Sequence, residues 1–173
     1  MIPSLARRRE AFTLIELLIV ISIIAILAGL AFPAVQGALG QGRKAQARND
    51  VNQLAAAIKA FQLEYGRLPA TAASPSSGDV VRALIGSNTT LNPRSIVFFE
   101  PKTAKSGKAG WDGNSYVDPW GMEYTILLDT GYSNRITADV GAGSQTYFTT
   151  AIIVSAGPDT NMTARTDNIS NVK

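Results

Sequence analysis

The pattern of hydrophobic and polar positions divides the first third of the chain into two parts. Residues 17–42 include no charged side chain, and a run of this length is sufficient for one helix to cross a bilayer. Glu16 lies just inside the apolar run, where a carboxylate near the membrane centre would cost about 2.5 to 3.5 kcal/mol. We therefore expect a membrane-spanning helix in which Glu16 has a partner.

After Pro33 the pattern becomes that of an amphipathic helix. Apolar residues recur at helical spacing, namely Val51, Leu54, Ala55, Ile58 and Phe61. The helix should end near Tyr65, because Gly66 can adopt the left-handed conformation and Pro69 follows. A helix over residues 12–65 would be about 80 Å long, so only its second half can pack on a globular domain. Pro33 and the glycines at positions 29, 37, 40 and 42 are where it would bend or melt.

The rest of the chain predicts a small α+β region. A stretch of small polar residues at 70–78 separates it from the long helix, and residues 80–85 are typical of a short helix. Residues 102–113 are typical of a loop, and β-branched and aromatic residues predict strands at 95–100, 123–128, 147–154 and, shorter, 135–138. We expect the long helix to pack against an antiparallel sheet of three or four strands. The predicted parts are a leader (1–11), a membrane and assembly half of the helix (12–35), its amphipathic half (36–69) and a globular region (70–173).

Composition excludes several classes of function. The chain of 173 residues contains neither cysteine nor histidine, which excludes disulfides, thiolate nucleophiles, Cys/His zinc sites and histidine general bases. No recognisable motif supplies a partner for a serine or threonine nucleophile, so we expect no enzymatic activity. The net charge is +3, but residues 1–11 carry three arginines and one glutamate, which leaves +1 without them. Nucleic-acid binding is therefore not expected.

Two simpler interpretations of the N-terminus compete with an assembly helix. An ordinary signal peptide could be cleaved after Gly29-Leu30-Ala31, which has the small-x-small pattern, so that the mature chain would start at Phe32. The apolar run is longer than the usual h-region of about 7–15 residues, however, and Glu16 interrupts it. An uncleaved anchor is the second interpretation. The arginines at 7–9 face Arg43, Lys44 and Arg48 across the apolar run, so the positive-inside count is nearly balanced.

The N-terminus resembles the type IV prepilin family, on the arginines at 7–9, the Ala11-Phe12 junction, the apolar run, Glu16 and Pro33. The resemblance implies that a prepilin peptidase cuts before Phe12 and N-methylates the new amine. Counting from Phe12, Glu16 and Pro33 occupy the fifth and twenty-second mature positions, as in the family, whereas Ala11 replaces the usual glycine. It also implies that Glu16 pairs with the amine of a neighbouring subunit during filament assembly, and that the leader lies in the cytoplasm.

Two further motifs narrow the resemblance to the major pseudopilin of type II secretion systems: YGRLP at 65–69 and DPWG at 118–121. We interpret DPWG as a structural type I turn, with Trp120 as a core residue. The resemblance implies an inner-membrane protein with a periplasmic domain, assembled into a homo-oligomeric pseudopilus with minor pseudopilins and an inner-membrane platform for protein export. One alternative is a type IV pilin for adhesion, motility or DNA uptake. The other is a monomeric membrane-anchored binding domain.

The C-terminal segment carries a candidate calcium site. In the major pseudopilins the loop corresponding to residues 155–169 binds calcium. The resemblance implies that Asp159 matches one family ligand, whereas Asn168 stands where the family has an aspartate before an isoleucine. Asn161, Asp167 and backbone carbonyls could supply further oxygens, and calcium requires six to eight. The loop is not an EF-hand, because Ala164 and Ser170 replace the necessary glycine and glutamate. With two carboxylates and a nearby Arg165, an ordinary polar loop remains the alternative.

Overall fold

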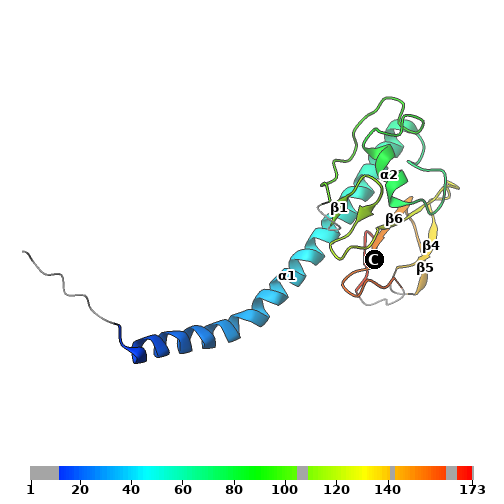
Figure 1. The fold of residues 1–173 in the computed structure, drawn as a ribbon. Helices are drawn as coiled ribbons and strands as arrows, with labels where there is room; N and C mark the ends of the chain where they lie inside the picture. The colour runs from blue at the N-terminus through cyan, green and yellow to red at the C-terminus, as the bar shows by residue number, and fades with distance from the viewer. Residues whose placement is uncertain (1–11, 105–108, 141–142, 163–166, 173) are drawn as a thin grey trace, which may run out of the picture. The chain divides into compact units, whose positions relative to one another are not determined.

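A computed structural model describes residues 12–104, 109–140, 143–162 and 167–172 of the chain. The chain divides into two compact units, Met1–Gln41 and Gly42–Lys173, each of which is described by itself. The predicted leader at residues 1–11 lies outside the described residues. Helix α1 (Leu14–Tyr65) contributes to both units (Figure 1).

In the first unit, α1 is helical through Pro33 and through every glycine that precedes and follows it. Proline removes one backbone donor and its ring presses on the carbonyl four residues earlier, which here belongs to Gly29. The sequence predicted that the helix would bend or melt at Pro33. The prediction of melting is wrong, because α1 continues through this residue. Among the described residues, α1 is the one helix long and apolar enough to cross a membrane.

In the second unit, the other half of α1 forms one wall of the main core. Of the residues predicted to share the apolar face, Val51, Leu54, Ile58 and Phe61 are fully buried, and Ala55 is half-buried. The helix ends at Tyr65, and Gly66 has a φ of 65° while its N–H donates to the carbonyl of Gln62. The predicted helix end is therefore confirmed, together with the left-handed glycine that follows it.

The sheets are small and antiparallel. The strands are β1 (Gly110–Trp111), β2 (Tyr116–Val117), β3 (Thr125–Leu128), β4 (Ile136–Asp139), β5 (Ser144–Tyr147), β6 (Ala151–Ser155) and β7 (Ile169–Ser170). They form a three-stranded sheet in the order β3-β6-β7 and two hairpins, β1-β2 and β4-β5. The α+β class with a long helix on a small antiparallel sheet is confirmed. The strands predicted at 123–128 and 135–138 correspond to β3 and β4.

Strand β6 is buried along its whole length because both faces of the three-stranded sheet are covered. Ala151 and Ile153 belong to the core formed with α1. Ile152 and Val154 point the other way, into a second core with β4 and β5. Because side chains alternate along a strand, β6 contributes to a separate core on each of its two faces.

Two strand predictions are wrong. Residues 95–100 form no strand: Ser95 has a φ of 48°, and the N–H of Phe98 donates to the carbonyl of Leu84. Their aromatic side chains pack instead, Phe98 on Phe61 and Phe99 on Tyr116. Residues 147–154 do not form one strand either, because a turn at 148–150 separates β5 from β6 and places them in different sheets. The predicted loop at 102–113 contains β1.

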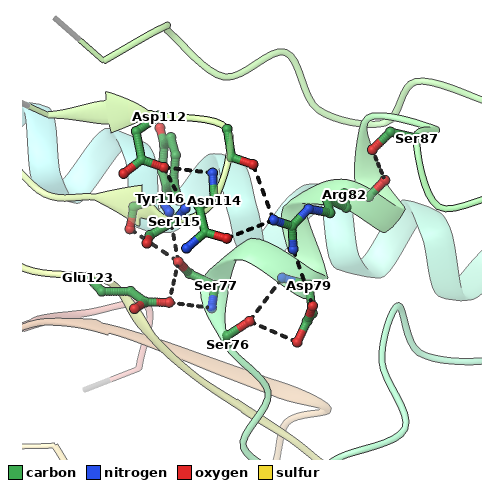
Figure 2. A network of polar contacts seen from close by, with 11 residues as sticks. Ser76, Ser77, Asp79, Arg82, Ser87, Asp112, Asn114, Ser115, Tyr116 and Glu123 are labelled. Atoms are coloured by element: carbon green, nitrogen blue, oxygen red, sulfur yellow. Dashed lines mark hydrogen bonds and ion pairs between the residues drawn. The ribbon is translucent and has the colours of Figure 1, made fainter.

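Helix α2 (Ser77–Leu84) corresponds to the predicted short helix and is held against the β1–β2 hairpin by polar contacts (Figure 2). Glu123 accepts hydrogen bonds of 2.8 Å from both the N–H and the hydroxyl of Ser77. Arg82 donates to the carbonyl of Gly113 and to Oδ1 of Asn114, and its guanidinium lies over the ring of Trp111. These contacts hold α2 against the β1–β2 hairpin and Glu123.

Candidate assembly and ion-binding sites

Glu16 lies in the first turn of α1 and is hydrogen-bonded to Thr13, the residue before the helix. Its Oε2 accepts from the N–H of Thr13 at 2.8 Å and from the Thr13 hydroxyl at 2.7 Å. In return, the N–H of Glu16 donates to the hydroxyl oxygen of Thr13 at 3.3 Å. This reciprocal pair is a capping box, which satisfies backbone donors that the helix itself leaves free. The proposed partner of Glu16, the amine of Phe12 on another copy, stays a prediction.

Phe12 is 80% exposed, and Ala11, the other residue of the predicted cleavage junction, lies outside the described residues. The remainder of the first unit is equally open. Its large apolar side chains from residue 14 to residue 39 are all exposed. This half of α1 therefore presents an apolar surface that the described part of the chain does not cover.

The four glycines of α1 have no contact that requires a small residue. A Cβ added at Gly29, Gly37, Gly40 or Gly42 would meet nothing within 4 Å. Crowding by the described part of the chain therefore does not explain these glycines. Small residues do allow neighbouring helices to approach closely in a membrane, which is a reason that lies outside the single chain.

The DPWG turn and the C-terminal segment are joined by one buried carboxylate. Asp118 Oδ1 accepts from the N–H groups of Trp120 and Met122, and its carbonyl accepts from Gly121. Asp118 Oδ2 accepts from the hydroxyl of Ser155 at 2.6 Å. Trp120 is half-buried and packs at the margin of the core, so it is less enclosed than predicted.

Beyond Ser155, three of the four predicted ion-binding residues are joined by hydrogen bonds. The N–H of Asp159 donates to Oδ2 of Asp167 at 3.1 Å, and Asp159 Oδ1 accepts from the N–H of Asn161 at 2.9 Å. The side-chain amide of Asn168 donates to the carbonyl of Met162. The structure thus brings Asp159, Asn161 and Asp167 together, and Asn168 follows Asp167 directly in the chain. Residues 163–166, with Ala164 and Arg165, lie outside the described residues.

Two oxygens of the predicted ion-binding residues receive no hydrogen bond from the part of the chain that the structure describes. Asp167 Oδ1 and Asn168 Oδ1 are both buried and have no hydrogen-bond partner among the described residues. A buried acceptor without a partner costs about 1–3 kcal/mol, so such atoms call for an explanation. Both atoms are oxygens, the ligand type that calcium prefers, and the donor set therefore fits calcium. No group of three or more acidic residues suited to a metal occurs among the described residues.

A second buried carboxylate was not anticipated from the sequence. Asp50 lies on the buried face of α1 and is only 4% exposed. Its Oδ2 accepts from the hydroxyl of Tyr124 at 3.1 Å, and the Tyr124 ring stacks on Tyr116 at 5.2 Å. Burial raises the pKa of the Asp50 carboxyl, although the Tyr124 hydrogen bond and the charge of Lys102 act in the opposite direction.

The two residues that sequence reasoning missed differ in the signal that could have revealed them. Thr13 and Glu16 match the pattern of a capping box directly before an apolar run, so Thr13 could have been identified. Asp50 gave no comparable signal, because its partner Tyr124 is 74 positions away. Only the packing of α1 against the strands brings them together.

Comparison with known proteins agrees with these features. The chain matches the prokaryotic N-terminal methylation motif over residues 6–32. It is 32% identical to the type II secretion system core protein G of Pseudomonas aeruginosa over 126 residues, which cover 70% of this chain and 75% of the relative. It is 27% identical to the protein of the same name from Pectobacterium carotovorum over 164 residues, which cover 95% of this chain and 85% of that relative.

A type IV major alpha-pilin from Moraxella bovis is 34% identical over 87 residues, but these cover only 50% of this chain and 54% of the pilin. No solved structure gives a significant match. The secretion relatives therefore match over a greater share of their length than the pilin does. With the methylation motif at its N-terminus and a pilin-like α+β fold, this chain belongs to the type II secretion system core protein G family of pseudopilins.

Proposed function

We propose that this chain is a structural subunit of a type II secretion pseudopilus, assembled from many copies through the first half of α1. The observation that carries the proposal is the exposed apolar surface of that half, which has no charged side chain between residues 17 and 41. Lipid covers such a surface before assembly, and the same segment of other copies covers it afterwards. The open space around the four glycines supports close approach of neighbouring helices.

The proposal includes a processing step. A prepilin peptidase cuts between Ala11 and Phe12 and methylates the new amine, in agreement with the methylation motif at residues 6–32. The cut creates a positively charged amine at Phe12. The amine of one copy then replaces Thr13 as the partner of the Glu16 carboxylate on the neighbouring copy. Each charge lowers the cost of holding the other in lipid. Assembly through Glu16 is therefore possible only after the cut.

The same proposal assigns location and partners. The helix crosses the inner membrane once, with the leader in the cytoplasm and the unit Gly42–Lys173 in the periplasm. The subunit is then extracted into a filament by the inner-membrane secretion platform, together with minor pseudopilins. The names of the secretion relatives support the assignment to a type II secretion system, and the apolar helix supports the membrane anchor.

The substitution Glu16→Ala, in cells that carry the secretion genes, tests the assembly role. Processing and membrane insertion should be unchanged, while sheared filaments are lost. Mass spectrometry of the N-terminus and electron microscopy of sheared fractions measure the two steps. Ser22→Ala is the matched control, because Ser22 is a polar residue of the same segment whose hydroxyl already donates to the carbonyl of Leu18. Normal filaments from Glu16→Ala, or a mature chain that starts at Phe32, would contradict the proposal.

We also propose that the C-terminal loop binds calcium. Asp159, Asp167, Asn168 and the carbonyl groups of the loop would hold the ion, with Asn161 as a further oxygen ligand. The two buried oxygens without donors support this assignment. A bound cation would supply the positive charge that these oxygens lack and would hold the last strand, β7, to the domain.

Calorimetric titration and thermal unfolding of the full chain in detergent micelles test the calcium proposal. Millimolar calcium should raise the unfolding temperature, because a ligand that binds only the folded state stabilises it. Asp167→Asn should abolish most of this rise. Asp112→Asn is the control, since Asp112 is exposed and accepts hydrogen bonds only within the β1–β2 turn. No heat of binding and no change in unfolding temperature would exclude calcium.

A further inference from the structure

Two grooves run along the second half of α1, inside the unit Gly42–Lys173. The first, which we call the Arg48 groove, has a volume of about 460 Å³ and lies between α1 and the C-terminal segment. Its walls combine the polar residues Arg48, Asn52, Asn168, Ser170 and Asn171 with the apolar residues Ile169 and Val172. Neither the Arg48 guanidinium nor the Asn52 amide has a hydrogen-bond or ion-pair partner among the described residues. The groove therefore offers free donors to a carboxylate.

The second groove, which we call the Glu100 groove, has a volume of about 400 Å³ and lies between α1 and residues 98–100. Its floor is apolar and is made of Ala56, Ala57, Ala60, Phe98 and Phe99, while Gln53 and Glu100 complete it. The Glu100 side chain is exposed and has no hydrogen-bond or ion-pair partner in the described part of the chain. Within the described part of the chain, one groove thus has an unpaired cation and the other an unpaired anion.

The two grooves lie on different flanks of one helix. At 100° per residue, Arg48 and Asn52 point roughly 110° away from the mean direction of Ala56, Ala57 and Ala60. Contact between one flank and the other on a second copy joins unlike surfaces, so it is a heterologous contact. Repeated along identical copies, such a contact generates an open helical filament when the rotation does not close.

We propose that the Arg48 groove of one subunit binds the Glu100 carboxylate of the next subunit. The inference rests on the proposed function, since it names the contact between the globular regions of neighbouring copies in the filament. The guanidinium of Arg48 and the amide of Asn52 donate to Glu100. The aliphatic stem of Arg48 lies against Phe98 and Phe99 of the Glu100 groove, as arginine stems commonly do on apolar surfaces.

The contact sets the register of the subunits and contributes little of the binding energy. Each groove holds only a few side chains, and a stable interface buries about 1,200–2,000 Å². The larger share of the affinity must come from the apolar half of α1. A charge pair at the margin of such an interface selects the correct arrangement and disfavours the alternatives.

Disulfide cross-linking tests the proximity directly, because the native chain has no cysteine. Full-length Arg48→Cys and Glu100→Cys chains, each with a different tag, are co-expressed with the secretion genes and oxidised in sheared filaments. We expect heterodimers between positions 48 and 100 and no homodimers at either position. Homodimers alone, or filaments that give no cross-link, would overturn the inference.

Charge reversal tests the energetic role. Arg48→Glu and Glu100→Arg should each lower the filament yield by roughly tenfold, and the double variant should restore most of it. Arg135→Glu makes the same change of charge at an exposed position outside both grooves and should leave the yield unchanged. Normal filaments from both single variants would overturn the inference while leaving the proposed function intact. Failure of the wild-type chain to form any filament would overturn both.

Discussion

The two halves of α1 contain similar apolar residues in opposite situations. Ile26 in the first half is 64% exposed, whereas Ile58 in the second half is fully buried. The second half finds its partners within the chain, in strands β3 and β6 and in residues 98–99. The first half has no such partner among the described residues. The comparison teaches that one helix can stabilise a fold at one end and present an interface for other molecules at the other end.

The test with the largest expected effect replaces one phenylalanine in each half of α1. Phe61 is fully buried, whereas Phe32 is 68% exposed. Phe61→Ala should lower the free energy of unfolding by about 3–5 kcal/mol, because it leaves a cavity, and Phe32→Ala should not change it. Both tryptophans, Trp111 and Trp120, lie in the second unit, so their fluorescence during urea unfolding of the full chain in micelles reports on that unit.

The control outcome is as informative as the loss. A destabilisation by Phe32→Ala beyond about 0.5 kcal/mol would mean that the first half of α1 contributes to the stability of the domain. The division between a packing half and an interface half would then fail.

Glycines give the second test. A Cβ at Gly78 in α2 would lie 1.8 Å from the carbonyl oxygen of Asn114, whereas a Cβ at Gly29 would meet nothing within 4 Å. Gly78→Ala should therefore destabilise the second unit by about 1–3 kcal/mol, since the β1–β2 turn must shift. Gly29→Ala should leave the unfolding transition unchanged and reduce filament yield. Equal unfolding curves for the two variants would show that the turn adapts freely.

The sequence predicted the local features of the fold better than the distant ones. The end of α1 at Tyr65 follows from a glycine and a proline only three positions apart, and its buried face follows from helical spacing. Residues 95–100 have the composition of a strand, yet they form none: their aromatic rings pack on α1 and on Tyr116 of β2. Short strands such as β7 depend on partners far along the chain, so composition gives little sign of them.

The candidate sites divide in the same way. Thr13 and Glu16 are three positions apart, so the local sequence alone can predict their contact. The hydrogen bond from Ser155 to Asp118 joins two motifs that the sequence analysis treated separately. Likewise, the contact of Asp50 with Tyr124 appears only when α1 packs on the strands. A local pattern can therefore suggest a site, but the fold decides which residues complete it.

The third test compares the carboxylates of the two halves of α1. Asp50 is buried and bonded to a distant tyrosine, whereas Glu16 is exposed and bonded to its neighbour Thr13. Burial raises the pKa of Asp50, so the folded chain binds this proton more tightly than the unfolded chain. The resulting stabilisation is complete below the unfolded pKa, near 3.8, and is lost as the pH rises through the folded pKa.

Asp50→Asn should remove this part of the pH dependence. The amide oxygen can still accept from Tyr124, and no charge is buried at any pH. Urea unfolding between pH 3.5 and 7 measures the free energy of unfolding of both proteins. The value for the variant minus that for the wild type should increase with pH. Tyr116 and Tyr124 stay protonated across this range, because burial raises the pKa of both. A constant difference between the two proteins would contradict the raised pKa.

The smallest expected effect belongs to the capping box at the start of α1. Thr13→Ala removes the hydroxyl that accepts from the N–H of Glu16, and the loss of such a cap costs about 0.5–2 kcal/mol. Hydrogen exchange of the Glu16 amide in micelles should accelerate by roughly five- to tenfold, while Thr13→Ser should behave as the wild type. Tryptophan fluorescence should detect no change in the unfolding of the second unit. Slower assembly of the Thr13→Ala chain would mean that the cap helps to position Glu16. Faster assembly would mean that Thr13 competes with the neighbouring amine for the Glu16 carboxylate. The cap would then satisfy Glu16 only until the amine of a second copy replaces Thr13.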